Sequence, residues 1–568
     1  MKQRIYLLLS TFVLILLIFV SCDVLDEEIV SGVTAETHYS VPEGFEDAVN
    51  ASYAFLRSFY GSETGGEMTV MGTDIIQNGG HGGAHYMNNY DAEMNSESGE
   101  FSTVWSEFYQ AINTTNAAVA RAADIEGMSE EEKNSRIGEV RFLRAHYYFI
   151  LVQYFGPVHL TLEETVGVET EAERMSEDVI YAAIVDDLEF AINNLPNTQS
   201  EFGRVTKPAA EHMLSLVLLT RGYQDFAEAD DFSRAATLAD NVINNYGHVL
   251  LDDFADVFDH DNEQHAEVIW SVQYTQDPLL NGDGNQSHLH YRPWYEVFSD
   301  GVDRALEPGY GRPWIRFRPT QFGMENYRPL DVDSRYNKSF QDVWYYNNAA
   351  GTPEGAAVGD TAIWVTDQFL TQPDVAEVQN RLPGVNLMTW NADNEGDEWF
   401  WDINLFPNLK KVDDFKRPSI NEPAGSRDYI VYRLAETYLI AAEALLQDGR
   451  PGEAVEYVNA VRRRAAWPGM EDQMEVTAGD LNIDFILDER GREFYGEQKR
   501  WFDLKRTGKL VERVKLYNKD SAPRLQTISR TIICFGLSRL LRGSSPPRST
   551  HKIRVISIKM FLYINMDA

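Results

Sequence analysis

The sequence predicts a mostly α-helical protein made of paired helices, with a large irregular lobe inserted between two groups of helices. Two observations lead to this fold class. Apolar residues recur at helical spacing in consecutive segments over about residues 42–250 and again over about 427–510. Between residues 275 and 423 this periodicity fades, while Gly, Pro, Asn, Asp and Trp become frequent, as is typical of long loops with few short elements.

The first helical group is expected to contain several helix pairs between residues 101 and 245. One helix has an apolar face formed by Trp105, Phe108, Tyr109, Ile112 and Asn116. The next helix should end at Gly156, a third at Leu195, and a fourth should carry Pro208 in its first turn. Residues 267–274 alternate in the way expected of a short strand.

The second helical group begins with two amphipathic helices in tandem. The first has an apolar stripe and stops at Gly449, and the second starts with Pro451 in its first turn. The two stripes consist of Leu434, Tyr438, Ala441, Ala442 and Leu445, and of Ala454, Tyr457, Val458 and Val461. Antiparallel helices with small residues at their contact and so short a turn form a tetratricopeptide-like hairpin.

A third helix dense in charge is expected to follow this hairpin. Its ionisable residues are Glu489, Arg490, Arg492, Glu493, Glu497, Lys499, Arg500, Asp503, Lys505 and Arg506. We interpret them as a salt-bridged helix surface that holds helices together. The spacing predicts i,i+3 ion pairs of Arg490 with Glu493 and of Glu497 with Arg500.

The chain begins with the pattern of a lipoprotein signal. Lys2 and Arg4 precede an apolar run over residues 5–20, and Ser21-Cys22 follows. Cleavage after residue 21 would leave Cys22 free for acylation, which gives stable membrane anchoring when two or more chains are attached. A membrane-spanning signal anchor is the alternative interpretation, which the cysteine disfavours.

Composition excludes several classes of function. The net charge of −38 argues against nucleic acid as a partner, because phosphate binding needs a basic face. The two cysteines, Cys22 and Cys534, cannot build a four-cysteine zinc site, and we expect no cofactor and no metal. Residues 260–265 and 281–285 contain ligand-type residues, but the first segment fits no metal motif. The second lacks the glutamate of a calcium loop.

Standard catalytic motifs are absent from the sequence. It contains no Gly-x-Ser-x-Gly elbow, no His-Glu-x-x-His, no Cys-x-x-Cys and neither common Gly-rich nucleotide loop. A glycosidase needs only two carboxylates at a fixed separation, so a glycan-degrading enzyme stays open as an alternative. A pure tetratricopeptide-type scaffold for proteins is the second alternative, which the Trp-rich loops disfavour.

Several ordered phrases of this chain resemble the SusD/RagB family of outer-membrane nutrient-binding lipoproteins. The matching phrases are Arg433-Leu-Ala-Glu436, Ala442-Glu443-Ala444, Asn459-Ala-Val-Arg462, Glu489-Arg490 and Arg500-Trp-Phe-Asp503-Leu-Lys-Arg506. The opening, with a helix beginning near Pro42, and the acidic residues after Cys22 also resemble this family and its signal for display on the cell exterior. Residues 22–523 are therefore expected to form one SusD-like domain.

The resemblance implies capture of a ligand without turnover. The implied partner is a SusC-like, TonB-dependent outer-membrane transporter that imports the captured oligosaccharide, with attachment to the membrane through the lipid anchor. Because SusD-like proteins are not confined to sugars, a peptide ligand is a further alternative. The loops 61–99 and 275–423 are implied to lie together, away from the repeats, and to form the ligand site.

Sugars present apolar C–H faces beside hydroxyl groups, so a site for them needs flat aromatic rings with hydrogen-bonding side chains nearby. The two loops offer six residues of these types: Tyr86, Tyr90, Trp294, Tyr295, Arg312 and Trp314. We expect at least one of Trp294 and Trp314 to be exposed in the site.

The last 45 residues do not fit the rest of the chain. Residues 524–568 hold eight Arg or Lys and one acidic residue, whereas the first 523 hold 42 basic and 87 acidic residues (50 minus 8 and 88 minus 1). A basic tail that binds an acidic partner is one interpretation. We favour a frameshift near residue 523, which predicts a tail that packs poorly on the domain.

Overall fold

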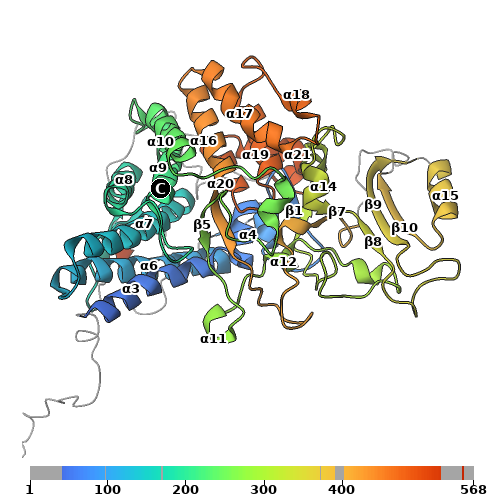
Figure 1. Ribbon diagram of the computed structural model, residues 1–568, viewed down its shortest axis with the longest axis horizontal. Helices are drawn as coiled ribbons and strands as arrows, with labels where there is room; N and C mark the ends of the chain where they lie inside the picture. Colours follow the sequence, from blue (N-terminus) through green and yellow to red (C-terminus); the bar gives the residue numbers. More distant parts are fainter. Residues whose placement is uncertain are drawn as a thin grey trace, which may run out of the picture.

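The computed structural model describes residues 41–91, 93–95, 97–167, 171–370, 372–390, 402–525 and 553–554. Helices form one side and the top of the molecule in Figure 1, and an irregular lobe with short strands forms the other side. The predicted fold class, paired helices with a loop-rich lobe, is confirmed.

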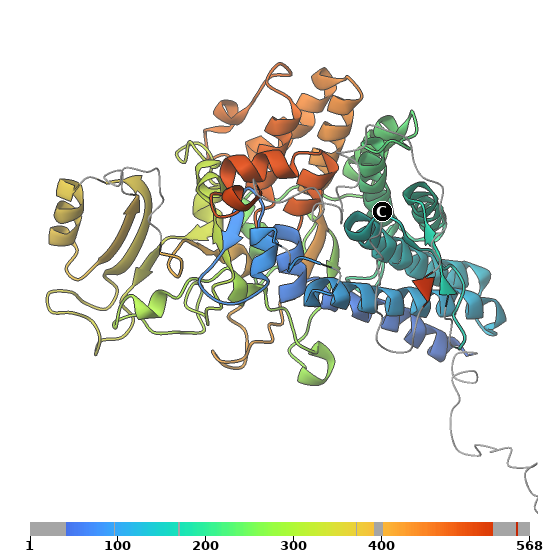
Figure 2. The same cartoon turned by 180° about the vertical axis from the view of Figure 1, so that it is seen from behind.

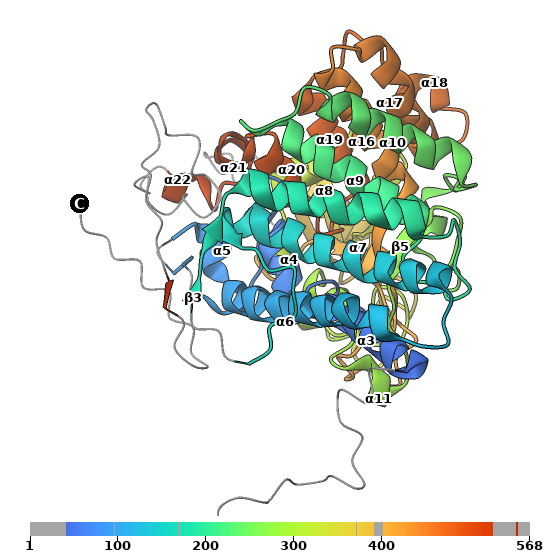
Figure 3. The same ribbon diagram turned by 90° about the vertical axis from the view of Figure 1, so that its left-hand side faces the viewer.

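The first helical group is a stack of long helices, which run across the picture one above another in Figure 3. Its members are α3 (Pro42–Ala54), α6 (Gly99–Arg121), α7 (Glu130–Phe155), α8 (Glu177–Asn194), α9 (Lys207–Gly222) and α10 (Asp231–Asn245). The predicted boundaries agree, since Pro42 and Pro208 lie in first turns and Gly156, at φ +66°, follows α7. A capping box of Ser129 with Glu132 starts α7.

The second group contains the predicted hairpin, α16 (Leu434–Gln447) and α17 (Pro451–Ala465), joined through Gly449 at φ +76°. Both apolar stripes face the protein interior, with Tyr438 and Tyr457 at their partly exposed edges. Because α10 packs against α16, the two helical groups form one continuous layer although the lobe separates them in sequence (Figure 1).

The predicted third helix is wrong as a single element. The structure has α19 (Ile483–Glu493) and α20 (Arg500–Arg506), followed by α21 (Leu510–Tyr517). The chain turns between the first two at Gly496 (φ +80°) and Gln498 (φ +55°). A Cβ on Gly496 would lie 2.3 Å from Leu409, so close packing as well as the turn requires glycine there.

The predicted i,i+3 pairs are also wrong, because the charges lie inside the protein. Arg490, Glu493, Glu497 and Arg500 are all buried, and each pairs with residues of other segments. The observed pairs are Arg490 with Glu436 and Asp503, Glu493 with Arg335 and Arg433, Glu497 with Lys411 and Arg433, and Arg500 with Asp74. The break after α19 allows Glu497 and Arg500 to face these separate partners.

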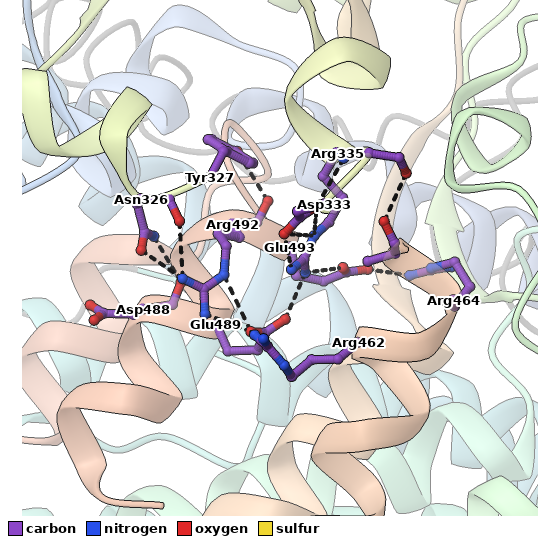
Figure 4. Close-up of polar contacts among 12 residues, drawn as sticks. Asn326, Tyr327, Asp333, Arg335, Arg462, Arg464, Asp488, Glu489, Arg492 and Glu493 are labelled. Atoms are coloured by element: carbon purple, nitrogen blue, oxygen red, sulfur yellow. Dashed lines mark hydrogen bonds and ion pairs between the residues drawn. The ribbon is translucent and has the colours of Figure 1, made fainter. Parts of the chain in front are cut away.

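This ionic network joins the lobe to the helices (Figure 4). Arg335 of the lobe lies 2.7 Å from Glu489 Oε1 and 2.9 Å from Glu493 Oε2, both on α19. Arg492 of α19 donates to the side chain of Asn326 in the lobe (2.8 Å). Since buried charges are tolerated only when paired, this network specifies how the lobe sits on the helices.

Acid is expected to destabilise the protein through this network. Burial alone would raise the pKa of Glu493, but the charges of Arg464, Arg433 and Arg335 outweigh it and lower the pKa from 4.5 to about 2. The ionised form therefore contributes about 3 kcal/mol that is complete above pH 4.5 and is lost as the pH falls toward 2. Urea unfolding at pH 7, 5, 4 and 3 measures this loss. A free energy of unfolding that stays constant between pH 5 and 3 contradicts it.

The lobe contains short strands in small sheets. β1 (Ile76–Asn78) pairs antiparallel with β6 (Phe317–Pro319), with Gln77 opposite Arg318. β5 (Val268–Val272) pairs antiparallel with β12 (Tyr429–Arg433) under the helices, and all five β5 residues are buried, although alternation was the pattern that predicted the strand.

A small sheet projects from the lobe, at the far right of Figure 1 and on the left in Figure 2. Its strands are β8 (Val343–Tyr345), β9 (Thr361–Phe369) and β10 (Asn386–Trp390), in the order β10-β9-β8. β9 runs antiparallel to β8 and parallel to β10, and α15 (Gln372–Arg381) makes the crossover between the parallel strands. Trp344 and Ile363 form the buried face of this sheet.

The remaining elements are short. The helices are α4 (Glu63–Val70), α5 (His85–Asn89), α11 (Pro278–Asn281), α12 (Ser287–His290), α13 (Gln321–Glu325), α14 (Arg335–Ser339), α18 (Glu471–Met474) and α22 (Ala522–Leu525). The strands are β2 (Val158–His159), β3 (Glu171–Ala172), β4 (Arg174–Met175), β7 (Phe340–Gln341), β11 (Asn408–Leu409) and β13 (Ile553–Arg554).

The expected lipoprotein signal at the start of the chain and the basic tail at its end lie largely outside the described residues. The expected signal and Cys22 lie there, and among the described helices none is long and apolar enough to cross a membrane. Of the expected aberrant tail, the structure describes 524–525 and 553–554, the latter paired with β3. Leu525 is buried beside Leu504 and Val514, so packed structure continues to this residue. The rest of the frameshift interpretation stays a prediction.

Candidate ligand-binding site

Four segments of the lobe meet at the candidate site: the loop after β1, residues 287–294, residues 312–316 and the segment at Asn404. Backbone hydrogen bonds join them. The Trp294 N–H donates to the Asn404 carbonyl (2.7 Å), and the Trp314 N–H donates to the Leu289 carbonyl (2.9 Å). Gly79 N–H donates to the Arg316 carbonyl (2.8 Å). The two tryptophans predicted for the site therefore come from segments that are bonded to a common framework.

The Gly-rich loop after β1 owes its composition to close packing. A Cβ on Gly80 would lie 1.8 Å from Asn404 Oδ1, and one on Gly79 would lie 2.2 Å from the Ile315 carbonyl oxygen. At Gly79 the obstacle is backbone, so only glycine lets the loop lie this close to Ile315. At Gly80 the obstacle is the end of the Asn404 side chain, which a larger residue would have to displace. The loop thereby places the exposed ring of His81 beside the site.

Trp294 forms the centre of one half of the site. Its ring is partly exposed and lies 5.0 Å from the ring of His81 in an edge-on arrangement. The indole Nε1–H donates to Glu296 Oε1 (2.9 Å), and Glu296 also forms an ion pair with Arg304. These contacts fix the orientation of the partly exposed indole.

Trp314, also partly exposed, forms the other half. Its ring lies 5.5 Å from the ring of His290 and 5.5 Å from the guanidinium carbon of Arg316. Arg316 pairs with Glu63 (2.6 Å) and donates to the His81 carbonyl (2.6 Å), which ties this half to the Gly-rich loop. Burial, with a contribution from Arg316, lowers the pKa of His290 to about 3, so its ring is neutral at physiological pH.

Arg312 lies between Trp314 and the loop that contains Asn421. It is partly exposed and donates to the Asn421 carbonyl through one guanidinium nitrogen (3.1 Å). Its other donors make no hydrogen bond within the part of the chain that the structure describes. Two partly exposed indoles with guanidinium, carboxylate and imidazole groups beside them suit a ligand that has both apolar faces and hydroxyl groups.

Two of the six predicted residues do not belong to this surface. Tyr295 is fully buried, stacks on Trp344 at 5.9 Å, and donates its hydroxyl hydrogen to the Tyr310 carbonyl (2.5 Å). Tyr90 is buried in a cluster with Leu487 and donates to the Gly72 carbonyl (2.7 Å). The expectation that these two rings face a ligand is corrected, because Tyr295 belongs to the main hydrophobic core and Tyr90 packs against residues of α19, α20 and α21.

The other four predicted residues lie at least partly at the surface. Trp294, Trp314 and Arg312 gather at the meeting point of the four segments, as described above. Tyr86 is half-buried on α5, where it packs on the core and its hydroxyl has no partner in the described part of the chain. Whether these residues contact a ligand stays a prediction.

Sequence reasoning missed three residues that shape the site: His81, Glu296 and Arg316. A signal for two of them was present, because His81 sits between two Gly-Gly pairs and Arg316 follows Trp314 by two residues. Nothing in the sequence alone placed Glu296 against the indole nitrogen of Trp294.

The segments with metal-type residues are engaged in other contacts. Asn281 Oδ1 accepts from the Thr275 N–H (3.0 Å), and Asn285 Oδ1 accepts from the Ser287 N–H (3.0 Å), so both amides stabilise the turn itself. His265 Nε2 bonds the Val257 carbonyl (3.1 Å). The same two amides also donate through Nδ2 to the carbonyls of Gly425 and Arg427 (2.9 Å each), so they join this turn to a distant segment.

Comparison with known proteins gives matches over most of the chain. The family model described as "SusD family" matches residues 266–527, and one described as "Starch-binding associating with outer membrane" matches 44–219. "SusD-like protein P2" of Formosa agariphila is 28% identical over 512 residues, which are 87% of this chain and 90% of that protein. "Starch-binding protein SusD" of Bacteroides thetaiotaomicron is 23% identical and covers 67% of this chain and 66% of its own length.

Solved structures share the fold. A "Laminarin binding SusD-like protein" superposes with a TM-score of 0.62 at 21% identity, covering 85% of this chain and 94% of its own. "Surface glycan-binding protein A from Bacteroides thetaiotaomicron in complex with laminarihexaose" has a TM-score of 0.61 at 20% identity, covering 84% and 92%. A SusD homologue from Bacteroides thetaiotaomicron has a TM-score of 0.67 at 20% identity, covering 87% and 94%.

Proposed function

Because this chain belongs to the SusD/RagB family, we propose that it is a surface glycan-binding protein that captures oligosaccharides for import. The observation that carries this proposal is the site formed by Trp294, Trp314 and His81. Two partly exposed indoles from different segments are fixed at one place, with Arg312, Arg316 and Glu296 beside them. Sugars offer the matching apolar faces and hydroxyl groups.

The relatives support the same class of ligand, since their names describe binding of starch or laminarin. We propose that the captured glycan passes to a SusC-like, TonB-dependent transporter in the outer membrane. The chain would be attached there through an acylated Cys22, with the body on the cell exterior. The 19 residues between Cys22 and Pro42 could span at most about 65 Å, which leaves the body close to the membrane.

Binding without turnover is the proposed mode of action. Glu296, which bonds the Trp294 indole, pairs with Arg304, and Glu63 pairs with Arg316 beside Trp314. This arrangement orients side chains for recognition, whereas glycoside hydrolysis needs two carboxyl groups directed at the scissile bond from opposite sides.

The chain from Asp23 onward, titrated by calorimetry with laminarin, starch, other polysaccharides and peptides, tests this proposal. Each ligand is analysed for cleavage after the titration. We expect saturable binding of a glycan that is recovered intact. Cleavage would make the protein an enzyme, binding of peptides alone would make it a peptide-capture protein, and binding of none of these ligands would favour a protein scaffold.

A further inference from the structure

The lobe carries an exposed tyrosine, Tyr345, outside the candidate site around Trp294. Tyr345 lies at the end of β8, and 48% of it is exposed. Its strand neighbour Trp344 points to the opposite, buried face of the sheet. The Tyr345 ring therefore stands on the outer face, where the projecting sheet joins the rest of the lobe.

A row of polar side chains connects Trp294 to Tyr345. Trp294 donates to Glu296, which pairs with Arg304, and Arg304 is the chain neighbour of Asp303. Asn347 then bonds the backbone of Asp303 twice, accepting from its N–H (2.7 Å) and donating to its carbonyl (2.9 Å). Asn347 follows Tyr345 by two residues in the chain, which completes the row. We call residues 303, 304, 345 and 347, which lie beyond Trp294 and Glu296 in this row, the distal strip.

The distal strip rests on a rigid base. Buried Tyr295 stacks on Trp344, with the two rings 12° from parallel, and its hydroxyl donates to the carbonyls of Tyr310 and Gly311. The Tyr310 hydroxyl accepts from the Tyr345 N–H (3.0 Å). Because the backbone under both aromatic residues is fixed by these contacts, a ligand would lose little affinity to ordering of the protein.

A single exposed tyrosine on a protein surface needs no functional explanation. Tyr345 differs because contacts through Arg304, Asp303 and Asn347 link it to Trp294, and Asp303 and Asn347 are exposed. An aromatic ring followed by hydrogen-bonding groups and a second aromatic ring repeats the chemistry that one sugar after another requires along a chain.

We propose that the distal strip is a second subsite, which binds the continuation of a glycan whose first sugars lie on Trp294. The ligand is then a linear saccharide of several sugars, with one of its distal sugars stacked on Tyr345. This inference rests on the proposed function. It sets a minimum length for the ligand, and it gives Tyr345 the role of favouring longer saccharides over shorter ones.

The test compares short and long ligands on two variants. Laminarin oligosaccharides of three and six sugars, and maltooligosaccharides of the same lengths, are titrated by calorimetry into the chain from Asp23 onward. We expect the wild type to prefer the hexasaccharide, and Tyr345→Ala to bind it about fivefold more weakly while binding the trisaccharide unchanged. Tyr345→Phe, which keeps the ring, should bind as the wild type does.

Phe202→Ala is the matched control, because Phe202 is an exposed aromatic residue (36%) in the loop before α9, outside the lobe. It should leave the affinity for every oligosaccharide unchanged. Equal affinity of the wild type for three and six sugars, or a hexasaccharide affinity unaffected by Tyr345→Ala, would overturn the distal subsite alone. If the wild type binds neither series and no other polysaccharide, this proposal falls together with glycan capture as its premise.

Discussion

Replacing Arg433 with methionine is expected to lower the free energy of unfolding by about 3–5 kcal/mol. Arg433 is fully buried between β12 and α16, and it pairs with Glu267 (3.0 Å), Glu493 (2.7 Å) and Glu497 (2.8 Å). Methionine fills similar space but removes the positive charge and all of these hydrogen bonds. Three carboxylates that remain buried would then have to share the other cations of the network.

Urea unfolding at pH 7 measures this effect, with Arg463→Met as the control. Arg463 is also an arginine of the second helical group, but its side chain is 39% exposed where it pairs with Glu475. Exposed ion pairs contribute about 0–1 kcal/mol, so the control should unfold almost as the wild type does. If both variants lose the same stability, the buried network does not hold the lobe and the helices together.

Replacing Trp294 with alanine is expected to weaken glycan binding about 30-fold, close to 2 kcal/mol. The partly exposed indole contacts His81 and bonds Glu296, so its removal takes away the proposed stacking surface and disturbs the polar group beside it. Trp314→Ala should weaken binding as well, because the second ring belongs to the same framework. Calorimetric titration with the glycan found for the wild type measures both.

Trp467→Ala is the control for these two variants. Trp467 is likewise partly buried and donates its indole hydrogen to a backbone carbonyl, that of Leu330, but it lies beside α17. Its loss should lower stability to a similar extent without changing affinity. Thermal unfolding of each variant, followed before the titration, separates loss of the site from loss of the fold. Wild-type affinity in both Trp294→Ala and Trp314→Ala would remove these residues from the site.

The helical part of the fold was predictable because its information is local. The stripes around Leu434 and Ala454, and the terminators Gly156 and Gly449, act within one or two turns of helix, and the structure confirms them. The charged segment after Ile483 was predicted less well. Its residues were recognised as structural, but helix spacing suggested partners three residues away, whereas Arg490 and Glu493 pair with residues of other segments.

The candidate site shows the same division between features set by nearby residues and features set by long-range packing. Aromatic residues in irregular segments directed attention to Trp294 and Trp314, which are partly exposed, whereas adjacent Tyr295 is fully buried. No periodic pattern distinguishes two neighbouring aromatic residues in a loop, because their burial depends on what the rest of the lobe packs against them. His81 and Glu296 entered the site only through long-range packing of the Gly-rich loop and the fixed geometry of the indole.

The sequence by itself determined the helix pairs, the position of the lobe between them and the family to which the chain belongs, since periodicity, caps and ordered phrases are properties of nearby residues. Tertiary structure alone decided which aromatic rings face solvent and which carboxylate each arginine meets. These depend on segments hundreds of residues apart, such as Asp74 and Arg500, that meet only when the burial of apolar surface has brought them together.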